Sequence, residues 1–332
     1  MTQNWQLSWS FGTAEVQALG GMLAPLTFRL ADGRSLQPMQ IAPWAGTKEA
    51  AGLQGIMQRL RGDWPCVPFG GPHVPEGLPA DWRIHAPDDT WQHGYAANHD
   101  WECVESRDDR LTIAIDYPDD SAISRLERRF VVDPTAARLD MELVIHARRA
   151  VRIPVALHPT FRVPAQPGHL VLEPSAHGTI YTYPVPTEPG VSHVTANATA
   201  ESLTRLPTQA APLDVTRLPL PFATEELLLV TDIGARNDSP QVVLHYLDED
   251  VRLGLWWDRS AMPDVMLWVS NAGRRAVPWS GRHYALGVEP VNGLFDLGRI
   301  ADVPESHALA SRKGITLDPA RPWSMRYRFG AW

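Results

Sequence analysis

The chain has few cysteines and no long hydrophobic run. Cys66 and Cys103 are its two cysteines, and neither lies at metal-ligand spacing from another cysteine, so a disulfide framework and a cysteine zinc site are excluded. We interpret both as free thiols of a reducing compartment, and a single disulfide between them stays open. The longest apolar stretches, such as 227–230 (LLLV), are far too short to span a bilayer. The first residues, MTQNWQLSWSFG, lack the basic and apolar parts of a signal peptide, so we expect a cytoplasmic protein.

An excess of basic residues is also missing. The formal net charge is −8 and the basic residues form no cluster, so nucleic acid and anionic membranes are not expected as partners. A neutral sugar is compatible with this charge. Hydrophobic residues make up 44% and charged residues 20% of the 332 residues, which is a globular composition. We expect a single domain over 1–332, present as a monomer or a homodimer.

Helical periodicity is scarce, and one short candidate helix covers 52–60. Apolar and polar residues instead alternate over 5–9, 139–145, 251–257 and 323–329. Side chains of a strand point to opposite faces in turn, so this pattern predicts half-buried strands. Strands near both chain ends predict that the two terminal segments share one sheet system. Strands separated by turns, without alternating helices, predict an antiparallel all-β sandwich.

Two features of the composition allow more than one interpretation. Seven prolines fall within 184–222, which predicts a long loop or a weak linker. We favour the loop, because the flanking strands have the same character, and loops of this length are often functional. The 13 tryptophans are mostly expected in the core, while a few aromatic faces could stack on the C–H groups of a sugar.

Common catalytic motifs are missing as well. The sequence has no Gly-rich phosphate loop between a strand and a helix, no HExxH and no GxSxG. His93 and His99 have no further ligand nearby, so no metal site is predicted.

Three other segments are distinctive: 91–103 (WQHGYAANHDWEC), 155–164 (VALHPTFRVP) and 267–296, which ends in GVEPVNGLFD. His158 ends an apolar strand and precedes a proline, and Glu289 ends the apolar strand YALGV before Pro290. Side chains at strand ends are held rigidly and can face a cleft. A His and a Glu there form a natural acid–base pair, because burial can shift both pKa values toward neutrality. Each residue alone is more often structural, but chance does not easily explain the three segments together.

The order H-G…W, H-P-x-F and E-P resembles the galactose mutarotase (aldose 1-epimerase) family, nearest to its hexose-6-phosphate epimerase branch. HGYAANHDW is similar to the HGFAR-x-x-W segment of that branch, HPTF to the catalytic histidine motif, and GVEP to the motif of the catalytic glutamate. Residues 60–73 (LRGDWPCVPFGGPH) look like the early active-site loop that supplies an arginine, here Arg61. The similar segments lie within residues 55–296.

This resemblance implies a large antiparallel β-supersandwich that holds a sugar in an open cleft on one sheet. It implies that His158 is the general acid at the ring oxygen, Glu289 the general base at the anomeric hydroxyl, and His93 a hydrogen-bonding partner of the sugar. No cofactor is expected, because only proton transfers and a bond rotation are needed. The residues expected to bind the substrate are Arg61, Asn98, Trp101 and Asn271.

The chain also departs from the family pattern. Ala97 stands where the phosphate-sugar branch has an arginine, whose planar fork matches phosphate oxygens. The histidine motif continues as 159–162 (PTFR), unlike that of simple mutarotases. The aspartate that contacts sugar hydroxyls has no clear match, and Glu225 and Asp232 are weak candidates. The sugar, and whether it is phosphorylated, therefore stay open. Arginines that could compensate for Ala97 are Arg61, Arg274, Arg275 and Arg282.

Two further classes compete with the epimerase. The first is a carbohydrate-binding or regulatory protein on the same scaffold without turnover. The second is a lyase or hydrolase, but glycoside hydrolysis usually needs a pair of carboxylates, and only Glu289 is placed by a motif.

Overall fold

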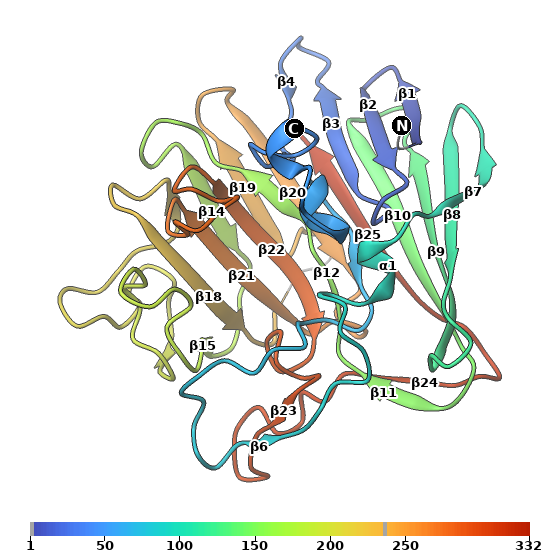
Figure 1. Ribbon diagram of the computed structural model, residues 1–332. Coiled ribbons are helices and arrows are strands. Elements are labelled where there is room, and N and C mark those ends of the chain that lie inside the picture. The colour runs from blue at the N-terminus through green and yellow to red at the C-terminus, as the bar shows by residue number, and fades with distance from the viewer. Residues whose placement is uncertain (1–2, 235–237) are drawn as a thin grey trace.

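The computed structural model describes residues 3–234 and 238–332, and nearly all of its regular structure is antiparallel β-sheet (Figure 1). Two large sheets dominate. The nine-stranded sheet has the order β17 (Arg217–Leu218), β14 (Leu170–Pro174), β19 (Val242–Tyr246), β20 (Val251–Trp257), β25 (Trp323–Ala331), β10 (Arg138–Ala147), β9 (Ile123–Val132), β8 (Arg110–Asp116) and β7 (Glu102–Ser106). The all-β sandwich predicted from the alternating pattern is confirmed.

The second large sheet has eight strands. Its order is β16 (Thr199–Ala200), β15 (Ile180–Thr182), β18 (Thr224–Val230), β21 (Asp264–Asn271), β22 (Tyr284–Asn292), β12 (Val155–Leu157) and β5 (Pro65–Cys66), and β13 (Thr160–Arg162) also pairs with β22.

Smaller elements surround the two large sheets. A four-stranded sheet contains β1 (Asn4–Trp9), β2 (Gly12–Gln17), β3 (Leu23–Arg29) and β4 (Ser35–Leu36), and two strand pairs join β11 (Val151–Ile153) with β24 (Ile315–Leu317) and β6 (Arg83–Ile84) with β23 (Ala301–Asp302). The helical turns are η1 (Lys48–Ala50), η2 (Gly55–Gln58) and α1 (Tyr95–Asn98). In the described residues, no helix has the length and apolar character to cross a membrane.

The two faces of the eight-stranded sheet have different neighbours. Leu286 and Val288 of β22 belong to the main hydrophobic core, together with Leu139 and Met141 of the nine-stranded sheet. On the opposite face, Val291 of β22 belongs to a second apolar cluster. That cluster includes Met266 and Leu229 of the same sheet and side chains of the early loops, among them Trp44, Ile56, Leu60 and Trp64. The early loops thus cover the face of the sheet that does not meet the nine-stranded sheet.

Several expectations from the sequence change in the structure. The helix expected over 52–60 is a single 3-10 turn, η2. Strands β1 and β25 lie in different sheets, so the expectation of one shared sheet system is wrong. Both still contribute to one hydrophobic core, where Leu7 and Phe329 are buried, and in Figure 1 both chain ends lie at the top of the view. The alternating pattern reports which side chains are buried, and it carries no information about which strand is the hydrogen-bonding partner.

The proline-rich segment 184–222 is a loop anchored to both large sheets. Its two short strands, β16 and β17, pair with β15 and β14 respectively. Leu203, Leu206 and Val215 of the same segment are buried in the main core. The loop interpretation therefore fits better than the linker interpretation. Both cysteines are free thiols, with Cys66 buried and Cys103 exposed.

Candidate active site

His158 and Glu289 meet on the covered face of the eight-stranded sheet. His158 follows the last residue of β12, at a strand end as expected. Glu289 lies inside β22, which continues to Asn292, so the strand end expected at this position is wrong. The Nε2 atom of His158 is 3.4 Å from Oε1 of Glu289, and the two side chains are 7% and 0% exposed. The sequence thus brings an imidazole and a carboxyl group into direct contact in a buried place.

The interruption between β12 and β13 explains this meeting. The N–H of Val288 donates to the carbonyl of Pro159 at 2.9 Å. Alternate residues of a strand present their N–H groups to the same side, so Pro290 faces the same neighbour without a donor. The neighbouring chain segment is interrupted there, because β12 ends before His158 and β13 begins after Pro159. The missing donor of Pro290 and the interruption of the neighbouring strand thus coincide.

A cavity of about 300 Å³ opens beside the pair, at the small end of the range for ligand sites. Its polar lining consists of Gln92, His93, His158, Arg274, Glu289 and Asp296. Trp64, Trp268 and Trp279 supply aromatic walls. The cavity therefore combines aromatic faces with a few convergent polar groups.

A larger cavity of about 560 Å³ lies over the nine-stranded sheet. Charged side chains there are already paired with one another: Arg129 lies 2.9 Å from Glu142, and Arg326 lies 3.5 Å from the same carboxylate. The smaller cavity is the candidate site, because some of its polar groups, such as the carboxyl group of Glu289, have unused hydrogen-bonding capacity.

The His158 ring is fixed by its neighbours. It stacks on Trp64 with ring centroids 4.2 Å apart and planes 14° from parallel, and its backbone N–H donates to the carbonyl of Trp64 at 2.9 Å. The Thr160 hydroxyl donates to the carbonyl of His158 at 3.4 Å, and its oxygen lies 3.2 Å from Nδ1. That oxygen can accept a hydrogen bond from an Nδ1–H group, and Nε2 is then the ring nitrogen that faces Glu289.

Burial favours the uncharged form of both groups. It lowers the pKa of His158 well below the ordinary 6.5, and the neighbouring His93 adds to the effect. Burial also raises the pKa of Glu289 well above 4.5, and the nearby Asp296 adds to that shift. Neither carboxyl oxygen of Glu289 has a hydrogen-bond partner among the described residues. An unsatisfied buried carboxyl group is costly, and a ligand hydroxyl in the cavity would satisfy it.

His93 joins the pair from a strained loop. Its ring lies edge-on to His158 at 5.1 Å and stacks on Phe69 at 5.4 Å. Burial, and after it the positive charge of Arg299, lowers the pKa of His93 to about 3. His93 is therefore a neutral hydrogen-bonding group. Its φ of +59° lies in the left-handed region, which is uncommon for residues other than glycine and is often found at functional sites.

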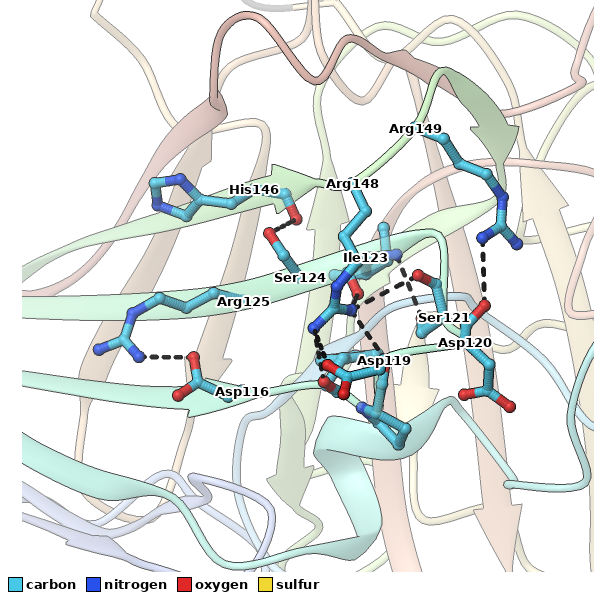
Figure 2. Close-up of polar contacts among 12 residues, drawn as sticks. Asp116, Asp119, Asp120, Ser121, Ile123, Ser124, Arg125, His146, Arg148 and Arg149 are labelled. Carbon is cyan, nitrogen blue, oxygen red and sulfur yellow. Dashed lines mark hydrogen bonds and ion pairs between the residues drawn. The ribbon is translucent and has the colours of Figure 1, made fainter.

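A hydrogen-bond network supports the loops beneath His93. The Tyr117 hydroxyl donates to the carbonyl of Val67 at 2.6 Å and accepts from the N–H of Ala96 at 3.4 Å. Arg148 in turn donates to the carbonyl of Tyr117 at 3.0 Å and to that of Ile123 at 2.6 Å, within the turn shown in Figure 2. The β8–β9 turn thus supports the segments that carry Phe69 and His93.

Two of the residues expected to bind substrate hold loops together. Arg61 donates from Nε to the carbonyl of Arg59 at 3.1 Å. Asn98 donates to the carbonyls of Gln92 at 2.7 Å and Gly94 at 2.8 Å, which shapes the turn around His93. Both lie outside the cavity lining formed by the described residues.

The other two expected binding residues are buried. Trp101 lies in the main core and donates from Nε1 to the carbonyl of Ala96 at 2.9 Å. Asn271, 2% exposed, bonds to Leu220 at 3.1 Å and to Phe222 at 2.6 Å. Neither is part of the cavity lining in the described part of the chain.

Asp296 is a cavity residue that the sequence interpretation did not assign to the site, and Arg274 was named there only as one of four arginines that could compensate for Ala97. Asp296 is half-buried, accepts a hydrogen bond from Tyr183 at 2.8 Å, and has a pKa raised by its partial desolvation. Among the described residues it is a second carboxyl group of the cavity lining, next to Glu289. Glu225 lies beside the cavity, paired with Arg274 at 3.2 Å, and Asp232 is an exposed partner of Arg312. The only signal for Asp296 was its place at the end of the GVEPVNGLFD segment.

Within residues 3–234 and 238–332, no three or more His, Cys, Asp or Glu side chains lie together as a metal would require. The prediction of a site without metal or cofactor stays a prediction.

No family model matches the chain, and no curated protein matches it. Solved structures match it over its whole length. A proposed aldose 1-epimerase from Escherichia coli K12 matches with a TM-score of 0.65 and 16% identity, covering 100% of this chain and 99% of that one. The chain has the galactose mutarotase-like fold.

Two further structures agree with that assignment. An aldose epimerase homologue from C. elegans matches with a TM-score of 0.62 and 12% identity, covering 100% of this chain and 99% of that one. A galactose mutarotase related enzyme from Lactobacillus acidophilus matches with a TM-score of 0.60 and 14% identity, covering 99% and 97%. The galactose mutarotase-like fold inferred from the motifs is thereby confirmed, and the hexose-6-phosphate epimerase branch stays a prediction.

Proposed function

We propose that the protein interconverts the anomers of an aldose by acid–base opening and closing of the sugar ring. The contact of 3.4 Å between His158 Nε2 and Glu289 Oε1 carries this proposal, because it joins an acid and a base within reach of one sugar ring. The unsatisfied carboxyl oxygens of Glu289 support it, since they can accept the anomeric hydroxyl. Solved structures with the same fold include proteins described as mutarotases and aldose epimerases.

The pair needs a single proton for the whole cycle. Glu289, as a carboxylate, takes the proton of the anomeric O1–H, while the imidazolium of His158 gives its proton to the ring oxygen O5. The C1–O5 bond breaks, C1=O1 forms, and rotation about C1–C2 presents the other face before the same steps run in reverse. Burial destabilises the charged pair that precedes ring opening relative to the uncharged pair that follows it.

The remaining cavity residues would orient the sugar. His93 donates or accepts through its ring nitrogens, Asp296 accepts from hydroxyls, and Arg274 donates to oxygens. Trp279, which is the least buried of the three wall tryptophans, offers an aromatic surface for the C–H side of a pyranose.

Anomer exchange measured by NMR tests the proposal directly. We expect the wild-type protein to speed exchange of at least one sugar in a panel of free aldoses and aldose phosphates above the rate in buffer. A His158→Asn variant should lose that increase. Exchange at the buffer rate for every sugar would contradict the proposal.

A second function has one observation in its favour. The three tryptophans of the cavity provide a binding surface that does not depend on proton transfer. A carbohydrate-binding protein without turnover would bind sugar in calorimetry with unchanged affinity after loss of both His158 and Glu289, and would not speed exchange.

The pH dependence follows from the two pKa shifts. The active pair holds one proton, and its two apparent pKa values belong to the pair as a whole. A second proton must go onto His158, whose pKa is lowered, so the acid limb of kcat/KM should lie below pH 6.5. The pair loses its last proton through Glu289, whose pKa is raised, so the alkaline limb should lie above pH 4.5. A rate that falls with acid through pH 6.5 would contradict a buried, neutral His158.

Gly287 provides a test of the carboxyl position. It lies on the same face of β22 as Glu289, and a Cβ at Gly287 would lie 2.4 Å from Oε1 of Glu289. We expect Gly287→Ala to displace the carboxyl group and lower kcat by about 10²-fold, since a shift of about 1 Å has that effect. Gly52→Ala is the matched control, because a Cβ at Gly52 meets no described atom within 4 Å. Equal kcat values in both variants would contradict the geometry.

A further inference from the structure

Arg274 is held in the wall of the cavity by an ion pair and two aromatic contacts, whereas the adjacent Arg275 is exposed. Its Nε atom lies 3.2 Å from Oε1 of Glu225, which is fully buried. Its guanidinium carbon lies 5.3 Å from the ring centre of Trp268 and 4.7 Å from that of Trp279. Contacts of this kind fix a guanidinium group in one plane.

The partner of Arg274 is itself built into the sheet. Oε1 of Glu225 accepts from Nε1 of Trp268 at 2.6 Å, and Oε2 lies 3.2 Å from the hydroxyl of Ser270. Gly273 lets the β21–β22 loop come close to this carboxylate, since a Cβ there would lie 2.6 Å from the backbone of Thr224 and 2.9 Å from Cβ of Glu225. Only a glycine fits that approach. The loop, the strand residue and the arginine thus form one arrangement.

We propose that Arg274 is the specificity-determining residue of the cavity, and that its two terminal nitrogens donate side by side to adjacent hydroxyl oxygens of an uncharged sugar. Glu225 is then a positioning residue: it pairs with Nε of Arg274 and leaves the two terminal nitrogens of the guanidinium group for the ligand. This inference rests on the proposed function. It assigns the arginine of the site to the β21–β22 loop, in place of the early loop that carries Arg61.

The charge around Arg274 favours a neutral ligand. Glu225 already balances the guanidinium, and Glu289 and Asp296 are the carboxyl groups of the same cavity. A phosphate or carboxylate on the sugar would meet an arginine whose charge Glu225 already balances. Hydroxyl oxygens accept from the fork without adding a charge.

A deoxy-sugar series with matched variants tests the proposal. We would measure KM and kcat for the sugar that wild type exchanges fastest and for each of its monodeoxy derivatives, in wild type, Arg274→Met, Arg274→Lys and the control Arg275→Met. We expect Arg274→Met to raise KM about 10- to 100-fold, as for loss of hydrogen bonds from a charged donor, with partial rescue by Arg274→Lys and no change in Arg275→Met. The two deoxy sugars that lack the contacted hydroxyls should lose affinity in wild type and lose nothing further in Arg274→Met.

Three outcomes would overturn the inference. One is a KM in Arg274→Met equal to that in Arg275→Met. Another is a deoxy-sugar penalty that stays the same in Arg274→Met, which is the result of a purely structural role. The third is a sugar phosphate that binds more tightly than its parent sugar in wild type and loses that advantage in Arg274→Met. If wild type exchanges no sugar at all, the proposed function fails, and the same series measured by calorimetric affinity still tests Arg274.

Discussion

Glu289→Gln should lower the rate of anomer exchange by about 10²- to 10⁴-fold, the contribution of a positioned acid–base group. The substitution keeps the size of the side chain in a place where Gly287 leaves room for it. It removes the only carboxyl group that contacts His158 among the described residues. The measurement is exchange NMR, with sugar affinity by calorimetry to establish that the cavity still binds. Exchange within twofold of wild type would rule out Glu289 as the base.

The same substitution should raise thermal stability. The pKa of Glu289 is raised in the folded protein, whereas the unfolded chain has the ordinary value. The unfolded chain therefore gives up its proton first as pH rises above 4.5, and the free energy of unfolding of wild type falls up to the folded pKa. The Gln variant lacks this loss, so its advantage in Tm should be larger at pH 8 than at pH 5. A lower Tm for the variant at both pH values would contradict the burial of a carboxyl group that lacks a hydrogen-bond partner.

Arg128→Met should lower the free energy of unfolding by about 3–5 kcal/mol, the cost of leaving one partner of a buried ion pair alone. The side chains of Arg128 and Asp63 are 1% and 0% exposed. Arg128 donates to Asp63, to the hydroxyl of Tyr327 and, at 2.6 Å, to the carbonyl of Gly21. Chemical denaturation measures the effect.

Arg129→Met is the matched control for that experiment. Arg129 is the next residue of β9, points to the exposed face, and pairs with Glu127 and Glu142 at 2.8 and 2.9 Å. Exposed pairs contribute about 0–1 kcal/mol. Similar losses in the two variants would contradict the distinction between buried and exposed pairs. Arg128→Met should also weaken exchange in the molecules that remain folded, because Asp63 precedes Trp64, on which His158 stacks.

The parts of the site that were predictable from sequence are those with local signals. His158 and Glu289 each follow an apolar run and precede a proline, and the structure places their side chains in contact. Trp101 and Asn271 lie in two of the same distinctive segments, but their hydrogen bonds to Ala96 and Leu220 hold them in the interior. Local sequence does not distinguish a wall residue from a core residue when both are polar or aromatic and buried.

Arg274 and Arg275 illustrate the other limit of prediction. They are adjacent in a loop and look alike as surface charges, yet only Arg274 has Glu225 and two tryptophans around it. Those three neighbours come from β18, β21 and the same loop, and strand pairing that brings β18 beside β21 is not a local property. Asp296 was missed for the same reason, since Tyr183 and Glu289 give it its environment.

The most direct test of the central claim is a crystal structure of the Glu289→Gln protein with a bound aldose. The account predicts the sugar in the cavity over β21 and β22, with its ring oxygen within hydrogen-bonding distance of His158 Nε2. The anomeric oxygen should lie at the side chain of position 289. A sugar held elsewhere, for example over the nine-stranded sheet, or bound with its anomeric carbon away from both residues, would contradict the account.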